Sequence, residues 1–516
     1  MILCLSIGLL ALTPLAYLLV RTIGETGGGT KTSSFLFSLR TLEHAGTSLG
    51  LAAVVTTAST LIALFLALCT GASDLPFRRT CTVLVVCPLA IPCYVGAAVY
   101  IGTFSPGGLL GGASEILGVR YGWFSGFWAS AFVLTLFTYP LAYLPIRAGL
   151  SRSDRTLLEA ARSLGHSRTR AWVHGMLPQI RTSMVAGSLM VALYTLSEFG
   201  AVSMLRCNTF TRVIYLEYES AFDRTGAALS SLALVALIGL ILLLGEWMRG
   251  RNTSGQTGRP ARPCRWRLGR WRWLGVPGVG VVTLLSVGIP LTSIFRWWGR
   301  SHSTDPVLDA ILPALVTTMV LAVVAAVVVV ILALPTSMLA SRYPSKLSRM
   351  IERITHIGFG LPGIVIGLAL VFVVLRFLPA VYQTWGIVIA GYVILFLAQA
   401  TGPLRAGFDR APRPLEDAAR TLGARWPRRL RRITIPLLVP GMSSAFLLVF
   451  ISTTKELPNT LLLAPAGSHT LSTRIWQYTE EAMYAESALP ALILIALSAM
   501  MVAGLVWREG MVEKTA

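Results

Sequence analysis

The side chains best suited to catalysis or metal binding are few in this chain and lie far apart. It has six histidines and seven cysteines, and no two cysteines show the C-x-x-C spacing of zinc and redox motifs. The histidines are scattered in the same way, whereas a metal site gathers three or four ligands around one ion. We therefore predict no catalytic residue, no metal site and no cofactor bound by this chain.

Two carboxylates remain as candidates for a functional role. Glu198 and Glu456 each follow, by about 20 residues, a proline that opens an apolar segment. An α-helix covers roughly 30 Å in that length, so both carboxylates are expected near the outer end of a membrane helix, where charge is costly and often functional. Two interpretations stay open. The pair lines an outer gate or the route of a cation, or each carboxylate snorkels or caps a helix, with Glu456 paired to Lys455.

A nine-residue segment occurs twice in the chain, 258 positions apart. It reads LLEAARSLG from residue 157 and LEDAARTLG from residue 415. Leucine, alanine and leucine recur at i, i+4 and i+7, one face of a short helix, and Gly165 or Gly423 then turns the chain. Thirteen residues later Pro178 or Pro436 opens an apolar segment, since proline fits the first turn of a helix. The pattern predicts a compact helical protrusion that is present twice.

The composition indicates which elements must carry these protrusions. Of the 516 residues, 54% are hydrophobic and 13% are charged, too few charges to cover a soluble domain of this size. A bilayer core is crossed by about 20 apolar residues. Segments of about that length occur at 1–20, 47–69, 81–103, 123–146, 183–205, 226–247, 274–296, 313–340, 354–378, 384–401, 437–457 and 484–507. We predict an all-α polytopic membrane protein with about 12 transmembrane helices.

The repeat extends beyond the nine-residue segment. The same offset carries Pro145-Ile-Arg-Ala-Gly onto Pro403-Leu-Arg-Ala-Gly, so we predict two pseudo-symmetric six-helix halves. An even number of spans in each half makes the repeat parallel. The predicted parts are a first half at 1–247 with its protruding loop at 148–181, an Arg-rich linker at 248–273, and a second half at 274–516 with its loop at 402–436.

The formal net charge of +21 first suggests nucleic acid. The basic residues, however, fall in alternate short loops between apolar segments, without a basic-aromatic groove or zinc-finger spacing. The positive-inside rule accounts for this asymmetry. It places both termini and both protrusions in the cytoplasm, with lipid and not nucleic acid as a partner. Segment 1–20 is interpreted as a retained first span.

The repeated segment resembles the EAA loop of ABC importer permeases. Its first copy has Glu, Ala and Ala, then Gly six residues after the Glu and Pro thirteen residues later, whereas the second copy has Asp417 where Glu is usual. The residues that the resemblance assigns to ATPase coupling are Glu159, Ala160, Ala161, Leu164, Gly165 and Pro178 in the first copy, and Asp417, Ala418, Ala419, Leu422, Gly423 and Pro436 in the second.

The resemblance implies a fold, partners and a location. In this family the loop is the coupling helix, seated in a cleft of each ATPase subunit. The chain would be a type I ABC importer permease of the bacterial inner membrane, with two copies of a cytoplasmic ATPase and a periplasmic or lipid-anchored substrate-binding protein. It contains no Gly-Lys dipeptide and hence no Walker A loop, so we expect a transport subunit whose partners use the ATP, not an enzyme.

Two further segments narrow the expected cargo. SEFGAVS at 197–203 and KELPNTLLL at 455–463 resemble the corresponding segments of ferric-iron importer permeases. Relatives that carry thiamine, phosphonate, sulfate or polyamines share the architecture, so these cargoes remain alternatives to ferric iron.

Two other classes of membrane protein remain as alternatives. A secondary transporter of twelve spans would show charge networks near the bilayer midplane, and it would leave the long repeated loops unexplained. A membrane-embedded enzyme or lipid flippase would need a catalytic constellation, and the sequence shows none.

Overall fold

The computed structural model describes most of the chain. It covers residues 38–71, 75–105, 124–151, 153–249, 272–300, 305–343, 345–410, 413–423 and 425–515, with isolated positions at 4–20 and 108–111. Nine of the 20 residues of the predicted first span at 1–20, and most of the predicted linker at 248–273, lie outside these residues.

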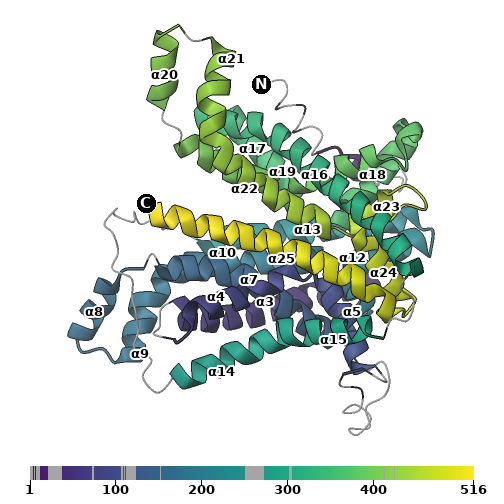
Figure 1. The fold of residues 1–516 in the computed structure, drawn as a ribbon, viewed down its shortest axis with the longest axis horizontal. Helices are drawn as coiled ribbons and strands as arrows, with labels where there is room; N and C mark the ends of the chain where they lie inside the picture. The colour runs from purple at the N-terminus through teal and green to yellow at the C-terminus, as the bar shows by residue number, and fades with distance from the viewer. Residues whose placement is uncertain are drawn as a thin grey trace. The chain divides into compact units, whose positions relative to one another are not determined.

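Within the described residues, nine helical segments are long and apolar enough to cross a membrane (Figure 1). They are α3 (Leu39–Gly71), α7 (Gly126–Ser151), α10 (Leu177–Ser197), α13 (Arg224–Arg249), α14 with α15 (Arg272–Thr283 and Ile289–Trp298), α16 (Asp305–Arg342), α19 (Trp385–Arg410), α22 (Ile435–Lys455) and α25 (Tyr484–Thr515). Helices satisfy their own backbone groups in lipid, which is why such spans are helical. The prediction of an all-α polytopic membrane protein is confirmed.

The segment at 81–103, expected as one span, is a bent pair of helices. The chain forms α4 (Arg78–Val86), η1 (Cys87–Ala90) and α5 (Cys93–Phe104), with a bend of 92° at the break. Pro92 causes it, because its extended backbone (ψ 144°) and missing N–H end the preceding helix.

The segment at 354–378 is broken in the same way. It forms α17 (Lys346–Gly360) and α18 (Gly363–Phe377), separated at Leu361 and Pro362, whose ψ angles are 132° and 140°. The residue before a proline is itself pushed toward extended backbone, so the break spans both positions.

The outer ends of two further spans also differ from expectation. The predicted spans at 183–205 and 437–457 continue through Glu198 and Glu456, but α10 ends at Ser197 and α22 at Lys455. Both glutamates have extended backbone, with ψ angles of 128° and 127°. Short helices, α11 (Gly200–Met204) and α23 (Pro458–Leu463), follow these breaks.

Contacts divide the chain into two compact units. The N-terminal unit comprises Leu36–Val213 and Ala233–Ser301, and the C-terminal unit comprises Met1–Phe35, Ile214–Leu232 and His302–Ala516. This division follows packing, whereas the predicted halves follow the sequence repeat. The boundaries of those halves stay a prediction.

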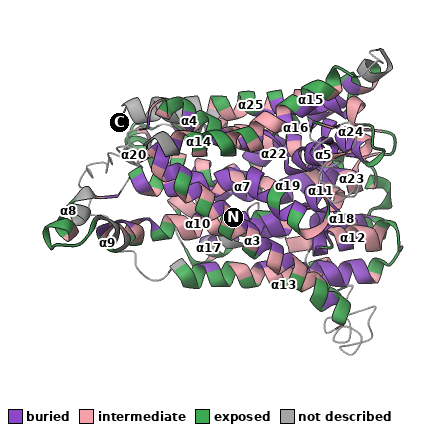
Figure 2. Cartoon of the chain, turned by 90° about the horizontal axis from the view of Figure 1, so that it is seen from below, coloured by how far each residue is buried: buried purple, intermediate pink, exposed green. Residues whose placement is uncertain are grey.

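Each unit is built around one central span. The most apolar stretch of α7 is 78% buried and that of α19 is 67% buried, against 28–39% for the other seven spans (Figure 2). The two central helices directly precede the repeated segments at residues 157 and 415. Each protrusion therefore follows the best-anchored helix of its unit.

Polar side chains join α3, α7 and α10 in the N-terminal unit. The hydroxyls of Thr70 on α3 and Tyr143 on α7 lie 2.7 Å apart, and those of Thr60 and Ser188 join α3 to α10 at 2.9 Å. In the membrane such bonds and close packing associate helices, because lipid is as apolar as the side chains.

Small residues bring the helices of the C-terminal unit together. Alanines with no exposed surface line the contacts of α16, α19 and α22. They are Ala322, Ala326, Ala333, Ala400 and Ala445. The helices α19 and α22 approach closely at Gly441 of α22, where an added Cβ would lie 2.7 Å from the carbonyl oxygen of Pro403. The Pro403 carbonyl belongs to the backbone of α19, so it cannot move aside as the end of a flexible side chain would.

We predict that Gly441→Ala destabilises the protein by about 1–3 kcal/mol, because it overpacks the α19–α22 contact. Gly402→Ala, in α19, is the matched control, since no atom lies within 4 Å of its added Cβ and alanine favours a helix over glycine. Thermal unfolding in detergent should show a lower midpoint for the first variant only. Equal midpoints for the two variants would contradict the close contact.

Candidate functional site

The first repeated segment forms a short helix that ends in an exposed leucine. Helix α8 (Arg155–Ser163) stops at Gly165, whose φ of +85° suits glycine. The Gly165 N–H donates to the Arg162 carbonyl (3.0 Å) and the His166 N–H to the Ala161 carbonyl (3.2 Å), a Schellman ending. Leu164, between helix and turn, is 79% exposed.

The second repeated segment has the same backbone. Helix α20 (Arg413–Thr421) leads to Gly423, with a φ of +76°, and the Gly423 N–H donates to the Arg420 carbonyl (3.0 Å). Leu422 is 87% exposed. We call these two structures the protrusions, defined as residues 153–176 and 413–434 within the described chain.

The other residues predicted for ATPase coupling also lie at the surface. Their side chains are exposed at Glu159, Ala160, Pro178, Asp417, Ala418 and Pro436, and half-buried at Ala161 and Ala419. Figures 1 and 2 show α8 and α20 outside the packed spans. The structure thus brings each predicted set together on one protrusion, with an apolar side chain at its tip.

A continuous helix joins each protrusion to a membrane span. In the first, α9 (Arg168–Ala171) runs through a π-helical turn, η2 (Trp172–Met176), into α10. The Leu177 N–H donates to the Trp172 carbonyl five residues back, and Pro178 follows. Because proline has no N–H and clashes with the carbonyl four residues before it, the wider turn lets the helix continue.

The second protrusion repeats this connection. Helix α21 (Trp426–Arg429) runs through the π-helical turn η6 (Leu430–Thr434) into α22, and the Ile435 N–H donates to the Leu430 carbonyl. The helix boundaries match those of the first protrusion at the offset of 258 residues.

Polar contacts of Asp154 and Gln179 close the root of the first protrusion. Oδ1 of Asp154 accepts the Thr156 N–H at 2.9 Å and caps α8. Oε1 of Gln179 accepts the Asp154 N–H at 2.8 Å, and its Nε2 donates to the carbonyl of Gly175 at 2.7 Å. Gln179 thus clamps the start of α8 to the start of α10.

The cap persists at neutral pH. The Thr156 N–H holds the pKa of Asp154 below its usual value of 3.8, because the hydrogen bond favours the charged carboxylate. A carboxylate with a lowered pKa contributes stability above its unfolded-state pKa and loses it only as the pH falls through the lowered value. The cap on α8 is therefore lost only below about pH 3.8.

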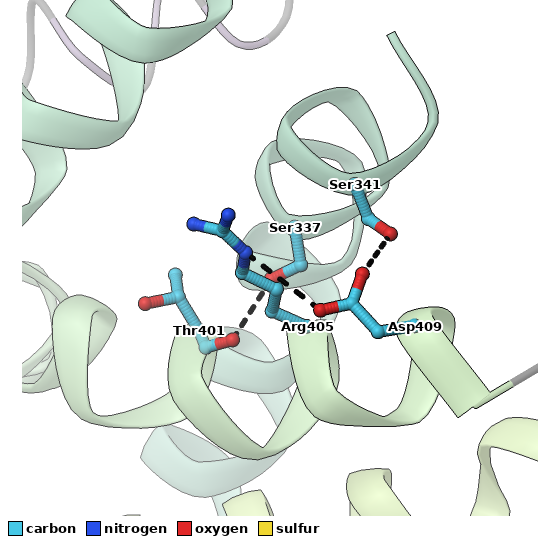
Figure 3. Close-up of polar contacts among 5 residues, drawn as sticks. All are labelled: Ser337, Ser341, Thr401, Arg405 and Asp409. Atoms are coloured by element: carbon cyan, nitrogen blue, oxygen red, sulfur yellow. Dashed lines mark hydrogen bonds and ion pairs between the residues drawn. The ribbon is translucent and has the colours of Figure 1, made fainter. Parts of the chain in front are cut away.

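Different residues brace the root of the second protrusion (Figure 3). The Ser341 hydroxyl on α16 donates to Oδ1 of Asp409 on α19 at 2.5 Å, and Nε of Arg405 lies 4.0 Å from Oδ2 of Asp409. The ion pair is half-exposed and contributes only about 0.3–0.5 kcal/mol. Position 437, 258 residues after Gln179, is a leucine, so the Gln179 clamp is not repeated.

Glu198 caps a short helix at the outer end of α10. Its Oε1 accepts the Ala201 N–H of α11 at 3.1 Å. The Tyr194 hydroxyl lies between Glu198 and the thiol of Cys93, the first residue of α5. The carboxylate therefore lies at a junction between the N-termini of α11 and α5.

Glu456 occupies the equivalent junction in the C-terminal unit. Both of its carboxylate oxygens accept the Asn459 N–H of α23 at 3.2 Å. An added Cβ on Gly363, the first residue of α18, would clash with Oε1 of Glu456. Both glutamates thus stabilise helix breaks. Lys455, the neighbour expected to pair with Glu456, is the last residue of α22.

Within the described part of the chain, no three His, Cys, Asp or Glu side chains come close enough to hold a metal ion. The rings of His166 and His174 stack with centroids 6.3 Å apart, but no carboxylate or thiol completes a ligand set with them there.

Sequence reasoning missed the clamp and the junction partners. The cap at Asp154 has a local signal, an aspartate just before a helical segment. The local sequence gives no signal for the roles of Gln179, Tyr194 and Asp409, because each role depends on a contact with another helix.

We predict that Gln179→Leu frees the start of α8, since leucine can neither accept the Asp154 N–H nor donate to its neighbours. Hydrogen exchange of the amides at 155–163 should quicken severalfold. Gln399→Leu is the control, because Gln399 instead accepts from Ser452 at 2.9 Å and should leave α8 unchanged. Unaltered exchange in the Gln179 variant would show that the clamp does not hold the protrusion.

The chain resembles known permeases over most of its length. A family profile described as "Binding-protein-dependent transport system inner membrane component" matches residues 59–252 and 333–509, which include both protrusions. The Fe(3+)-transport system permease protein FbpB 2 of Haemophilus influenzae is 33% identical over 72% of this chain and 74% of its own length.

Two other relatives are more distant. The putative 2-aminoethylphosphonate transport system permease protein PhnV of Salmonella typhimurium is 27% identical over 30% of this chain and 59% of its own length. The probable ABC transporter permease protein y4fN of Sinorhizobium fredii is 25% identical over 68% and 67%. The chain therefore belongs to the inner-membrane components of binding-protein-dependent transport systems, the permeases of ABC importers.

Proposed function

We propose that this permease is driven by two copies of a separate cytoplasmic ATPase, one docked on each protrusion, and that it imports ferric iron delivered by a substrate-binding protein. The chain itself binds no cofactor, and its partners use the ATP. With both protrusions facing the cytoplasmic ATPase, both termini of the chain are also cytoplasmic.

The exposed leucines carry the proposal. Leu164 and Leu422 are 79% and 87% exposed at equivalent tips outside the membrane spans. A leucine held in water on a rigid turn gains about 1.5–3 kcal/mol when a partner buries it. Two tips with one backbone geometry fit two copies of one partner, although Glu159 and Asp417 give the two docking faces different carboxylates.

Rigid helices would transmit the force. When ATP closes the ATPase dimer, the tips move together, and the continuous helices that end in α10 and α22 carry this motion into the membrane. The permease then switches between inward-facing and outward-facing states by rigid-body motion.

The Haemophilus influenzae relative supports ferric iron as the cargo, because it matches about three-quarters of both chains. The Salmonella phosphonate permease supports a second candidate, 2-aminoethylphosphonate, over a shorter match. Without a metal-ligand cluster among the described residues, selectivity for iron is assigned to the binding protein, and the permease provides a path and not a chelating site.

We further propose that Glu198 and Glu456 act as caps and do not bind the cargo. Each carboxylate accepts an N–H three residues ahead, at Ala201 or Asn459. The cap keeps α11 and α23 in place beside the breaks at the outer ends of α10 and α22.

Docking through the tips predicts the effect of Leu164→Asp combined with Leu422→Asp. Affinity for the ATPase should fall about tenfold or more, because a charge cannot replace a buried leucine. The assay is ATP-dependent uptake of radioactive ferric iron into vesicles that hold the permease, its ATPase and iron-loaded binding protein. Leu39→Asp is the control, since Leu39 is also 87% exposed but lies at the start of α3.

Normal ATPase binding and uptake in the double variant would refute docking through the protrusions. The unmodified permease could instead import 2-aminoethylphosphonate and not iron, with this uptake lost in the double variant. That result would support docking through the protrusions and refute ferric iron as the cargo.

The caps make a separate prediction. Glu198→Gln and Glu456→Gln keep an oxygen that accepts the N–H of Ala201 or Asn459, and should retain uptake. Glu198→Ala and Glu456→Ala lose the cap and should destabilise the protein by about 1 kcal/mol, measured by thermal unfolding. Loss of uptake in stable, normally folded Gln variants would show that the charges serve the cargo.

A further inference from the structure

A row of arginines distinguishes the second protrusion from the first. Arg425, Arg428, Arg429 and Arg432 recur at i, i+3, i+4 and i+7, the spacing of one helix face. Arg425 directly precedes α21, Arg428 and Arg429 lie on α21, and Arg432 lies on η6. The positions 258 residues earlier hold Ser167, Arg170, Ala171 and His174. The backbone is repeated here, but the charge is not.

Among the described residues, the guanidiniums of this arginine row have no carboxylate partner. Arg425, Arg428 and Arg432 are exposed, and Arg429 is half-buried, with an Nε that no described atom accepts. None of the four pairs with a described carboxylate; the ion pair nearby joins Arg405 to Asp409. Four unpaired cations on one face favour an anionic surface that brings many phosphates or carboxylates together.

The row lies where a membrane surface would be. The span that contains α22 begins at Leu430, so the arginines occupy roughly 10 Å of helix at the edge of the hydrocarbon, about the depth of the headgroup layer. Exposed apolar side chains follow directly on α22, with Leu437 at 41% and Val439 at 52%. A cationic face that continues into a lipid-facing apolar face is typical of a membrane-surface contact.

The first protrusion lacks this continuity. Gln179 and Arg181 stand at the positions of Leu437 and Val439, so polar side chains follow where the second span exposes apolar ones. An ATPase is also expected to meet the tip at Leu422, whereas the arginine row lies at the base, where the helix enters the membrane. Both contrasts favour lipid over protein as its occupant.

We infer that the arginine row binds the headgroups of anionic phospholipids and so ties the second protrusion, but not the first, to the membrane surface. Arginine is suited to this contact because its planar fork binds phosphate oxygens in pairs. Such binding depends on salt, because the charges lie at a water-exposed surface.

The test compares lipid selectivity in two triple variants of the full chain. Arg425→Gln, Arg428→Gln and Arg432→Gln remove three exposed charges from the row. Arg162→Gln and Arg170→Gln, in the first protrusion, and Arg181→Gln, at the start of α10, also remove three exposed charges. Each protein is reconstituted in phosphatidylcholine vesicles with trace spin-labelled phosphatidylglycerol or spin-labelled phosphatidylcholine. The motionally restricted fraction gives the preference for the anionic lipid. Circular dichroism checks that both variants fold.

The preference of the unmodified protein should fall at least fivefold in the first variant, remain in the second, and weaken as salt is raised. Equal loss in both variants would mean that total charge and not this row attracts the lipid, and would overturn the inference. An unchanged preference would also overturn it. If affinity for the ATPase fell in the first variant instead, the row would be a protein-docking surface.

Discussion

A helix inside a membrane can respond to a partner outside it only if no flexible joint lies between them. In this permease the helix that leaves each protrusion stays continuous despite a proline near the start of the span. Residues Arg168 to Ser197 run as one helical path about 45 Å long, and the π-helical turn before Pro178 absorbs the clash that would break an ordinary α-helix. The same π-helical turn recurs before Pro436, and under the proposed function both helices would carry the motion of the protrusions into the membrane.

A rigid helical path must also be held in place at its start, near the protrusion, and at its outer end. Near the roots, the Gln179 clamp joins the start of α8 to α10, and the Ser341–Asp409 bond joins α16 to α19, the helix before the second protrusion. At the outer end, Glu198 and Glu456 cap the short helices that follow each break. The backbone of the repeat is thus kept while its side-chain contacts differ.

Much of this arrangement could be predicted from local sequence. The spans follow from apolar length, and the protrusions from a repeated leucine face that ends in Gly165 and Gly423. Prolines mark the breaks at Pro92 and Pro362 in the sequence, but an apolar run does not show how far the helix bends there, which is 92° at the first break. The extended backbone at Glu198 was missed for the same reason, since its cause is a cap on a helix that hydropathy does not separate from the span. Contacts between distant helices, such as that of Gln179, leave no local trace.

Docking of the ATPase depends most on where the leucine tips lie and on what covers them. The direct measurement places single cysteines at Leu164 and Leu422, in a chain whose native cysteines are replaced, and labels them with a membrane-impermeant maleimide. Labelling should fail in intact spheroplasts, succeed in inverted membrane vesicles, and be blocked there at both positions by the bound ATPase. Labelling from the outer side, or labelling that the ATPase does not reduce at either tip, would contradict the account.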